Sequence, residues 1–221
     1  MKGQTPAITA VLITTVIVGS VATAYVWGTP LLEKRQGQAD IQQVENNAVN
    51  IHNKIIAVSE GGSGTTERVE FNSDSDSELR INTDKDFIEI TTEGQQSSYA
   101  PDSWNFIQGK SLQNLTFGDG DYGTESDDLP GVLAVRPSTT GASGSFLRYR
   151  IEFRNILADT PTGQRLQKID LTSAGQKRAV KDATLLISNQ GTELDTGNQR
   201  VELSNGEKIE RTRTVVEVDI R

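Results

Sequence analysis

Cysteine is absent from the 221-residue chain, and histidine occurs only once, as His52. These absences exclude disulfide scaffolds, thiol nucleophiles, thiolate metal sites and zinc sites built from several histidines. They also leave no cysteine–histidine catalytic pair. We therefore expect neither enzyme activity nor a cofactor, and we expect His52 to be a solvated or hydrogen-bonded residue rather than a ligand.

Basic residues are scarcer than acidic ones, with 22 Lys and Arg against 30 Asp and Glu and a net charge of −8. Such a chain repels phosphate backbones, so we expect no nucleic-acid partner. From Glu60 onward there are 27 acidic and 18 basic residues. This acidic surface favours solubility, and it is also tolerated in a high-salt habitat because the Debye length shrinks to about 3 Å at 1 M.

One long apolar run, Ala7–Trp27, contains 21 residues without a charge. As a helix it would span roughly 30 Å, the thickness of a bilayer's hydrocarbon core. The alternatives are a buried core helix and a secretory signal cleaved after Ala22-Thr23-Ala24. We favour a retained anchor, because the run continues through Tyr25 and Trp27, where aromatic side chains meet lipid headgroups.

Small and hydroxylated residues are frequent inside this run. Gly19 and Thr23 stand four residues apart, as do Ser20 and Ala24. Spacing of this kind lets apolar helices approach closely. We therefore expect the run to pack against other helices, through a membrane or filament-core surface comprising Ala7, Leu12, Val16, Gly19, Ser20, Thr23, Ala24 and Trp27.

The N-terminal residues read KGQTPAITAVLITTVIVGSVATAYVWG, a short basic leader, a Thr-Pro step and a helix rich in small and β-branched residues. This region resembles the N-terminus of archaeal type IV pilins and archaellin-like proteins. The resemblance implies a class III signal peptide, cleaved after Gly3 to leave Gln4 as the first residue. Pro6 fits this arrangement, because proline is tolerated in the first turn of a helix. Many pilins carry an acidic residue at the position of Ile8.

A second helical pattern follows the Gly28-Thr29-Pro30 step, which we interpret as a hinge or kink. From Leu31 to Val58 apolar residues recur at spacings of three and four, on an otherwise polar helix. This amphipathic seam comprises Ile41, Val44, Ala48, Ile51, Ile55 and Val58. We expect the seam to cover one face of the following domain; the alternative is that it also meets neighbouring helices in a filament.

A glycine-rich linker at residues 60–66 separates the helix, 4–59, from a β-rich domain at 67–221. The fold class expected is α+β: a long kinked N-terminal helix followed by an antiparallel β-sandwich or Greek-key barrel. The candidate strands are 67–71, 78–82, 87–92, 112–117, 132–136, 146–157, 165–172, 183–188, 200–204 and 208–220. Asn205-Gly206 predicts a two-residue hairpin turn.

Two further motifs lie in the β-rich domain. The acidic loop 118–128 carries Asp119, Asp121 and Glu125, which are weak candidates for a Ca²⁺ site. Its spacing departs from the helix–loop–helix calcium pattern, so we expect a solvated loop and no metal. Asn114 begins an Asn-Leu-Thr glycosylation sequon, which is usable if the domain is outside the cell.

Together, these observations indicate a structural subunit of an archaeal type IV pilus-like surface filament. The subunit would be a single-pass membrane protein before assembly and would then form a helical homo-oligomer through its N-terminal helix. The β-rich domain would be displayed on the cell surface, with adhesion as the expected role. The alternative is a membrane-anchored or secreted β-domain that never polymerises and binds a partner or carbohydrate.

The first residue of the mature protein distinguishes pilin-type processing from ordinary secretion and from an unprocessed anchor. We expect Edman degradation or mass spectrometry of the cell-surface protein to find Gln4 first, because the leader resembles a class III signal. Tyr25 as first residue would instead indicate ordinary secretion, and Met1 an unprocessed anchor.

Overall fold

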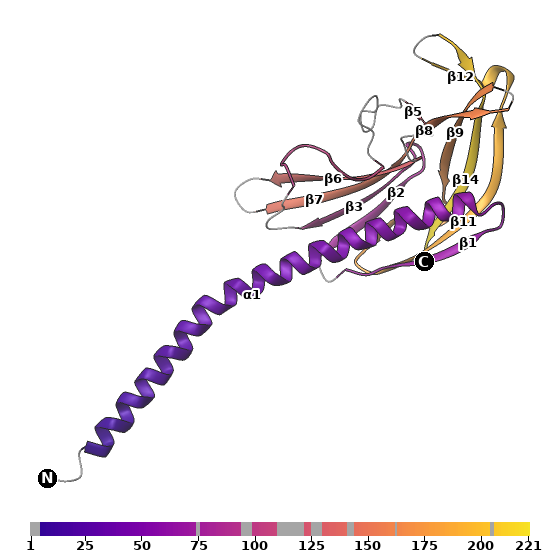
Figure 1. The fold of residues 1–221 in the computed structure, drawn as a ribbon. Coiled ribbons are helices and arrows are strands. Elements are labelled where there is room, and N and C mark those ends of the chain that lie inside the picture. The colour runs from indigo at the N-terminus through magenta and orange to yellow at the C-terminus, as the bar shows by residue number, and fades with distance from the viewer. Residues whose placement is uncertain are drawn as a thin grey trace. The chain divides into compact units, whose positions relative to one another are not determined.

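The structure is a computed structural model, which describes residues 5–73, 76–93, 99–109, 122–124, 130–140, 144–161, 163–203 and 206–221. The chain divides into two compact parts, Met1–Ala39 and Asp40–Arg221. We call the second part the body. One long N-terminal helix and a strand-rich body together form the α+β arrangement expected from the sequence (Figure 1).

Helix α1 runs from Thr5 to Glu60 as one element and contains Pro30. Proline removes one backbone donor but does not end the helix here, so the Gly28–Pro30 step is not a boundary between two helices. The helix ends where the side-chain amide of Asn189 donates to the carbonyls of Val58 and Ser59, at 3.0 and 3.2 Å. These bonds satisfy two of the carbonyls that every helix C-terminus leaves without an intrahelical donor.

The described strands form two six-stranded sheets and a two-stranded ribbon. Sheet A has the order β1-β11-β14-β9-β8-β5, and its strands are β1 (Thr66–Phe71), β5 (Tyr122–Thr124), β8 (Asn155–Thr160), β9 (Gly163–Thr172), β11 (Ala183–Asp195) and β14 (Arg211–Ile220). Sheet B has the order β10-β2-β3-β7-β6-β4, and its strands are β2 (Ser77–Asn82), β3 (Phe87–Glu93), β4 (Asn105–Gln108), β6 (Gly131–Thr140), β7 (Gly144–Phe153) and β10 (Arg178–Val180). The ribbon pairs β12 (Val201–Glu202) with β13 (Lys208–Ile209).

Most described strand pairs are antiparallel, as expected, but two pairs in sheet A are parallel. They are β14 with β9 and β5 with β8. Parallel neighbours need a long connection between them. The segment between β9 and β14 supplies one, since it contains β10, β11 and the ribbon.

The run 146–157, expected as one strand, is two strands in different sheets. β7 ends at Phe153 in sheet B, and β8 begins at Asn155 in sheet A. The buried positions explain the break, because they are odd-numbered as far as Phe153 and even-numbered from Ile156. A strand cannot change the face that it buries without a local irregularity.

The core of the body lies among three surfaces: α1, sheet A and sheet B. Its members include Val44, Ile51 and Ile55 from the helix, Val69, Phe71, Leu185, Ile187, Val216 and Val218 from sheet A, and Leu79, Ile88, Ile90, Leu147, Tyr149 and Ile151 from sheet B. Figure 1 shows this segment of α1 running beside the strands of the body. The helix is therefore a structural part of the body, because each sheet buries apolar side chains in the same core as the helix.

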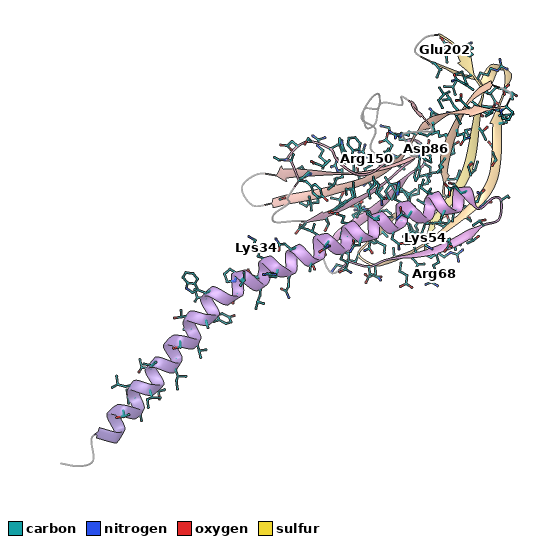
Figure 2. All side chains as sticks on the ribbon, viewed as in Figure 1. Lys34, Lys54, Arg68, Asp86, Arg150 and Glu202 are labelled. Carbon is teal, nitrogen blue, oxygen red and sulfur yellow. The ribbon has the colours of Figure 1, made fainter. Side chains whose placement is uncertain are left out.

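Asp86 ties the two sheets together at the turn before β3, where it adopts a positive φ of 49° (Figure 2). Its carboxylate pairs with Lys168 on β9 and accepts a hydrogen bond from the Leu171 backbone N–H at 3.0 Å. Its carbonyl accepts from the Phe153 N–H at 3.0 Å. The side chains of Asp86 and Lys168 are both largely buried. Removal of either partner would therefore leave the other charge buried with fewer partners, which is costly.

Ile55→Ala tests the contribution of the helix to the body. Ile55 is fully buried in the core, so we expect truncation to lower the free energy of unfolding by about 2–5 kcal/mol. The measurement is denaturant unfolding of the full chain in mild detergent, followed by circular dichroism. Asn50→Ala, at an exposed position on the same helix, is the matched control and should change stability by no more than about 0.5 kcal/mol. A loss below about 1 kcal/mol for Ile55→Ala would show that the helix contributes little to the stability of the body.

Candidate functional site: the exposed apolar segment of α1

The N-terminal part of α1 presents an exposed apolar surface among the residues that the structure describes. Twelve large apolar side chains between Val11 and Leu32 are at least 55% exposed, and they radiate from the helix in Figure 2. Val16 is 66% exposed and Trp27 is 79% exposed. Burial of each such side chain is worth roughly 1.5–3 kcal/mol, so this surface strongly favours an apolar partner over water.

The remaining predicted members of this surface lie on the same segment. Gly19, Ser20, Thr23 and Ala24 are exposed, and a Cβ placed on Gly19 would meet nothing within 4 Å. Ala7 belongs to α1, and its backbone is helical. The small residues therefore leave a region where a second backbone could approach closely.

Threonine hydroxyls on this segment are satisfied within the helix. Thr14, Thr15, Thr23 and Thr29 each donate to the carbonyl four residues earlier, at 2.8–2.9 Å. A hydroxyl that is bonded in this way needs no water, and its methyl group remains on the surface. These four threonines therefore do not oppose transfer of the helix into a lipid or protein interior.

Length and composition make this segment able to cross a membrane. Its apolar window has a mean hydropathy of 1.9 and is 0% buried, and it is the one such span among the described residues. A signal sequence near the N-terminus would meet the same criteria. The structure therefore supports a segment of the membrane-anchor or signal type.

The predicted seam is buried, unlike the apolar segment. Val44, Ala48, Ile51, Ile55 and Val58 are fully buried within the body, and Ile41 packs partly buried against the same core. The five fully buried residues have no surface left for a neighbouring molecule. The seam therefore covers the β-rich domain, as expected.

His52 lies beside the seam and is also buried. Its Nε2 lies 3.0 Å from the carbonyl oxygen of Gly131 on β6, so Nε2 carries the proton that it donates. Its Nδ1 lies 3.2 Å from Asn53 Oδ1. His52 is thus a hydrogen-bonded structural residue that joins α1 to sheet B.

A carboxylate with two phenol partners also fixes α1 to the body. Glu45 accepts hydrogen bonds from the hydroxyls of Tyr99, at 2.8 Å, and Tyr149, at 3.4 Å. Burial and the Glu45 carboxylate raise the pKa of Tyr99 to about 12. The same two causes raise the pKa of Tyr149 still further above its ordinary value.

Other polar contacts of α1 were not anticipated from the sequence. Gln43 and Asn47 both donate side-chain hydrogen bonds to the carbonyl of Asn72, at 3.1 and 2.6 Å, and Lys54 pairs with Glu67 at 3.2 Å. The sequence indicates only that Gln43, Asn47 and Lys54 lie on one side of a helix, because of their spacing. Their partners at either end of β1 could not be read from that spacing.

Several predicted sites lie outside the described residues. These are the processing residues Gly3 and Gln4, the sequon residue Asn114, and the acidic-loop residues Asp119, Asp121 and Glu125. Within the described residues, no three His, Asp or Glu side chains gather as they would around a metal ion.

Comparison of the chain with protein-family models, with curated proteins and with solved structures finds no match.

The raised tyrosine pKa values predict a loss of stability at alkaline pH. A folded-state pKa above the ordinary value of 10 means that the folded protein holds its proton more tightly than the unfolded chain. The corresponding stabilisation is complete below pH 10 and is lost as the pH rises through about 12. We expect Tyr99→Phe to make the free energy of unfolding fall less steeply over this range, with part of the slope left by Tyr149. Denaturant titrations at about pH 9, 10, 11 and 12 measure this; identical slopes for both proteins would contradict it.

Proposed function

We propose that the chain is a structural subunit of a pilus-like surface filament, which polymerises through the apolar segment of α1 and displays the body. The supporting observation is an apolar window that is 0% buried, on a helix whose other half buries one face in the body. The N-terminal Lys-Gly-Gln-Thr-Pro motif adds the resemblance to archaeal type IV pilins. In this proposal the segment resides in the membrane before assembly and among neighbouring copies afterwards.

The physical case for association rests on the composition of the segment. In lipid there is no hydrophobic drive between apolar helices, so they associate through close packing and through polar groups that need partners. Here the hydroxyls of Thr14, Thr15 and Thr23 bond to their own helix, so close packing is the main source of attraction between two such helices. Gly19 and Ser20 permit that close approach. When copies leave the lipid, burial of the remaining apolar side chains against one another keeps them from water.

A single-pass anchor for a non-polymerising binding domain is the second candidate. It is favoured by the exposure of Tyr25 and Trp27, 73% and 79%, near the end of the apolar run, where aromatic side chains typically meet headgroups. Both candidates require an apolar environment for α1, and they differ in whether a helix from a second copy provides it.

Val16→Asp tests filament formation. A carboxylate in the middle of the apolar segment costs about 3 kcal/mol on insertion into an apolar environment. This cost lowers the equilibrium constants for membrane insertion and for assembly about a hundredfold each. We expect it to abolish filaments in negative-stain micrographs while the body keeps its circular dichroism in detergent. Gln38→Asp adds the same charge to an exposed position of the same helix outside the apolar run, and it should leave filaments intact.

Gly19→Leu separates assembly from anchoring, because leucine keeps the segment apolar but blocks close approach of a second helix. Loss of filaments with normal membrane insertion supports the filament subunit. Filaments like those of the wild type from the Val16→Asp chain would overturn the proposal. A wild-type chain that inserts into membranes and never polymerises would support the anchored domain instead.

A further inference from the structure

The outer face of α1 in the body is a stripe of uncharged side chains. The exposed positions between 42 and 57 are Gln42, Asn46, Asn50, Asn53 and Ala57, which recur at spacings of three and four. We call these five residues the amide stripe. Among the described residues, Gln42, Asn46 and Asn50 have no side-chain hydrogen-bond partner. The amides of these three residues are therefore available to a molecule outside the chain.

The charges closest to the stripe on α1 already have partners. Glu45 accepts from Tyr99 and Tyr149, and Lys54 pairs with Glu67. The stripe is bounded along the helix by Asp40 and Glu60. On a chain with a net charge of −8, this is a stretch of helix about 24 Å long whose exposed positions carry no charge.

Helix stability does not account for this composition. Asparagine is a weaker helix former than alanine, glutamate or lysine, because its side chain competes for the backbone in other conformations. The exposed side of a surface helix carries charged or other polar residues, and charged ones such as Glu and Lys are the better helix formers. Asn46, Asn50 and Asn53 occupy that exposed side instead.

Amide side chains are suited to meeting identical copies of themselves. Each Asn or Gln carries two N–H donors and one carbonyl acceptor, so two amides can exchange hydrogen bonds in several relative positions. Like charges that face one another between copies would repel. A surface that is neutral and self-complementary fits a second copy of this chain better than it fits a strongly charged partner.

We propose that the amide stripe is a contact between neighbouring copies of this chain, made when their apolar segments assemble. This inference rests on the filament proposed above, and it identifies a second, polar contact on the same helix. A helix face about 24 Å long and 10 Å wide offers roughly 240 Å² per copy, well below the about 800 Å² per partner of a stable interface. The stripe therefore adds to the apolar contact and cannot hold two copies together alone.

Thiol labelling maps this contact directly, because the chain has no cysteine of its own. The variants are Asn46→Cys and Asn50→Cys in the stripe, with Gln167→Cys on β9 as an exposed control. Each is labelled with a maleimide in purified filaments and again in subunits dissociated by detergent. We expect labelling in filaments to be at least tenfold slower at positions 46 and 50 and to change less than twofold at 167.

Charge insertion provides an independent measurement. Asn46→Asp with Asn50→Asp adds two carboxylates without changing side-chain size, and Gln167→Glu with Gln199→Glu adds the same charge elsewhere on the body. We expect the stripe variant to raise the subunit concentration needed for assembly about tenfold at low salt. Added salt should reverse most of that increase, because it screens the repulsion. The control pair should stay within twofold of the wild type.

The outcomes separate the two proposals. Wild-type filaments in which Asn46→Cys and Asn50→Cys label as fast as in free subunits would overturn the amide stripe and leave the filament proposal intact. Equal protection at all three positions would also overturn it, since the stripe would not be distinguished from the rest of the body. Absence of filaments from the wild-type chain would overturn both.

Discussion

Burial of one face of α1 is the interaction on which the body depends. The seam residues of the helix enter the same core as both sheets, and Asn189 from β11 closes the end of the helix. Apolar side chains of both sheets are buried in one cluster together with that helix. The same polypeptide segment continues toward the N-terminus as a surface that is apolar on every side. One helix thus combines a half whose apolar residues are satisfied inside the chain with a half whose apolar residues are not.

A network of largely buried ion pairs joins the strands of the body. Asp86 binds Lys168 and the Leu171 N–H, and Lys168 also lies 3.4 Å from Asp170. Arg213 then joins Asp170, at 2.6 Å, to Asp195, at 3.0 Å. Burial tends to raise the pKa of Asp170, but the Arg213 hydrogen bond and the Lys168 charge outweigh it and lower that pKa. A buried network with its partners in place restricts the arrangements of strands that the core can adopt.

Periodic features of the fold were predictable from the sequence, because they depend on neighbours only a few residues apart. The α1 seam was found from spacings of three and four, and β2, β3 and β9 from alternating apolar residues. Strands β4, β5 and β10 were missed, since three or four residues at a sheet edge carry too little pattern, and β5 lies within the segment 118–128 that was expected to be a loop. The parallel pairing of β9 with β14 was missed because it joins segments about 45 residues apart. In the candidate site, the apolar segment of α1 could be predicted from composition alone. The contacts of Glu45 could not, because they join residues 54 and 104 positions apart.

No local sequence pattern specifies a contact between residues so far apart in the chain, such as those of Glu45 with Tyr99 and Tyr149. The break between β7 and β8 is an intermediate case. The change in the phase of buried residues is present in the sequence, but the sheet that receives β8 is decided by the packing of the whole body.

The polar contacts between α1 and β1 determine how the body would respond to force. Lys54 meets Glu67 near the start of β1, and Gln43 and Asn47 meet Asn72 just beyond its end, so helix and strand lie side by side in opposite directions. A pull along the helix axis would load these contacts and the buried seam simultaneously, in shear. Rupture would then require many interactions to fail together, rather than one after another as in peeling. A domain built in this way can bear tension that enters through its helix.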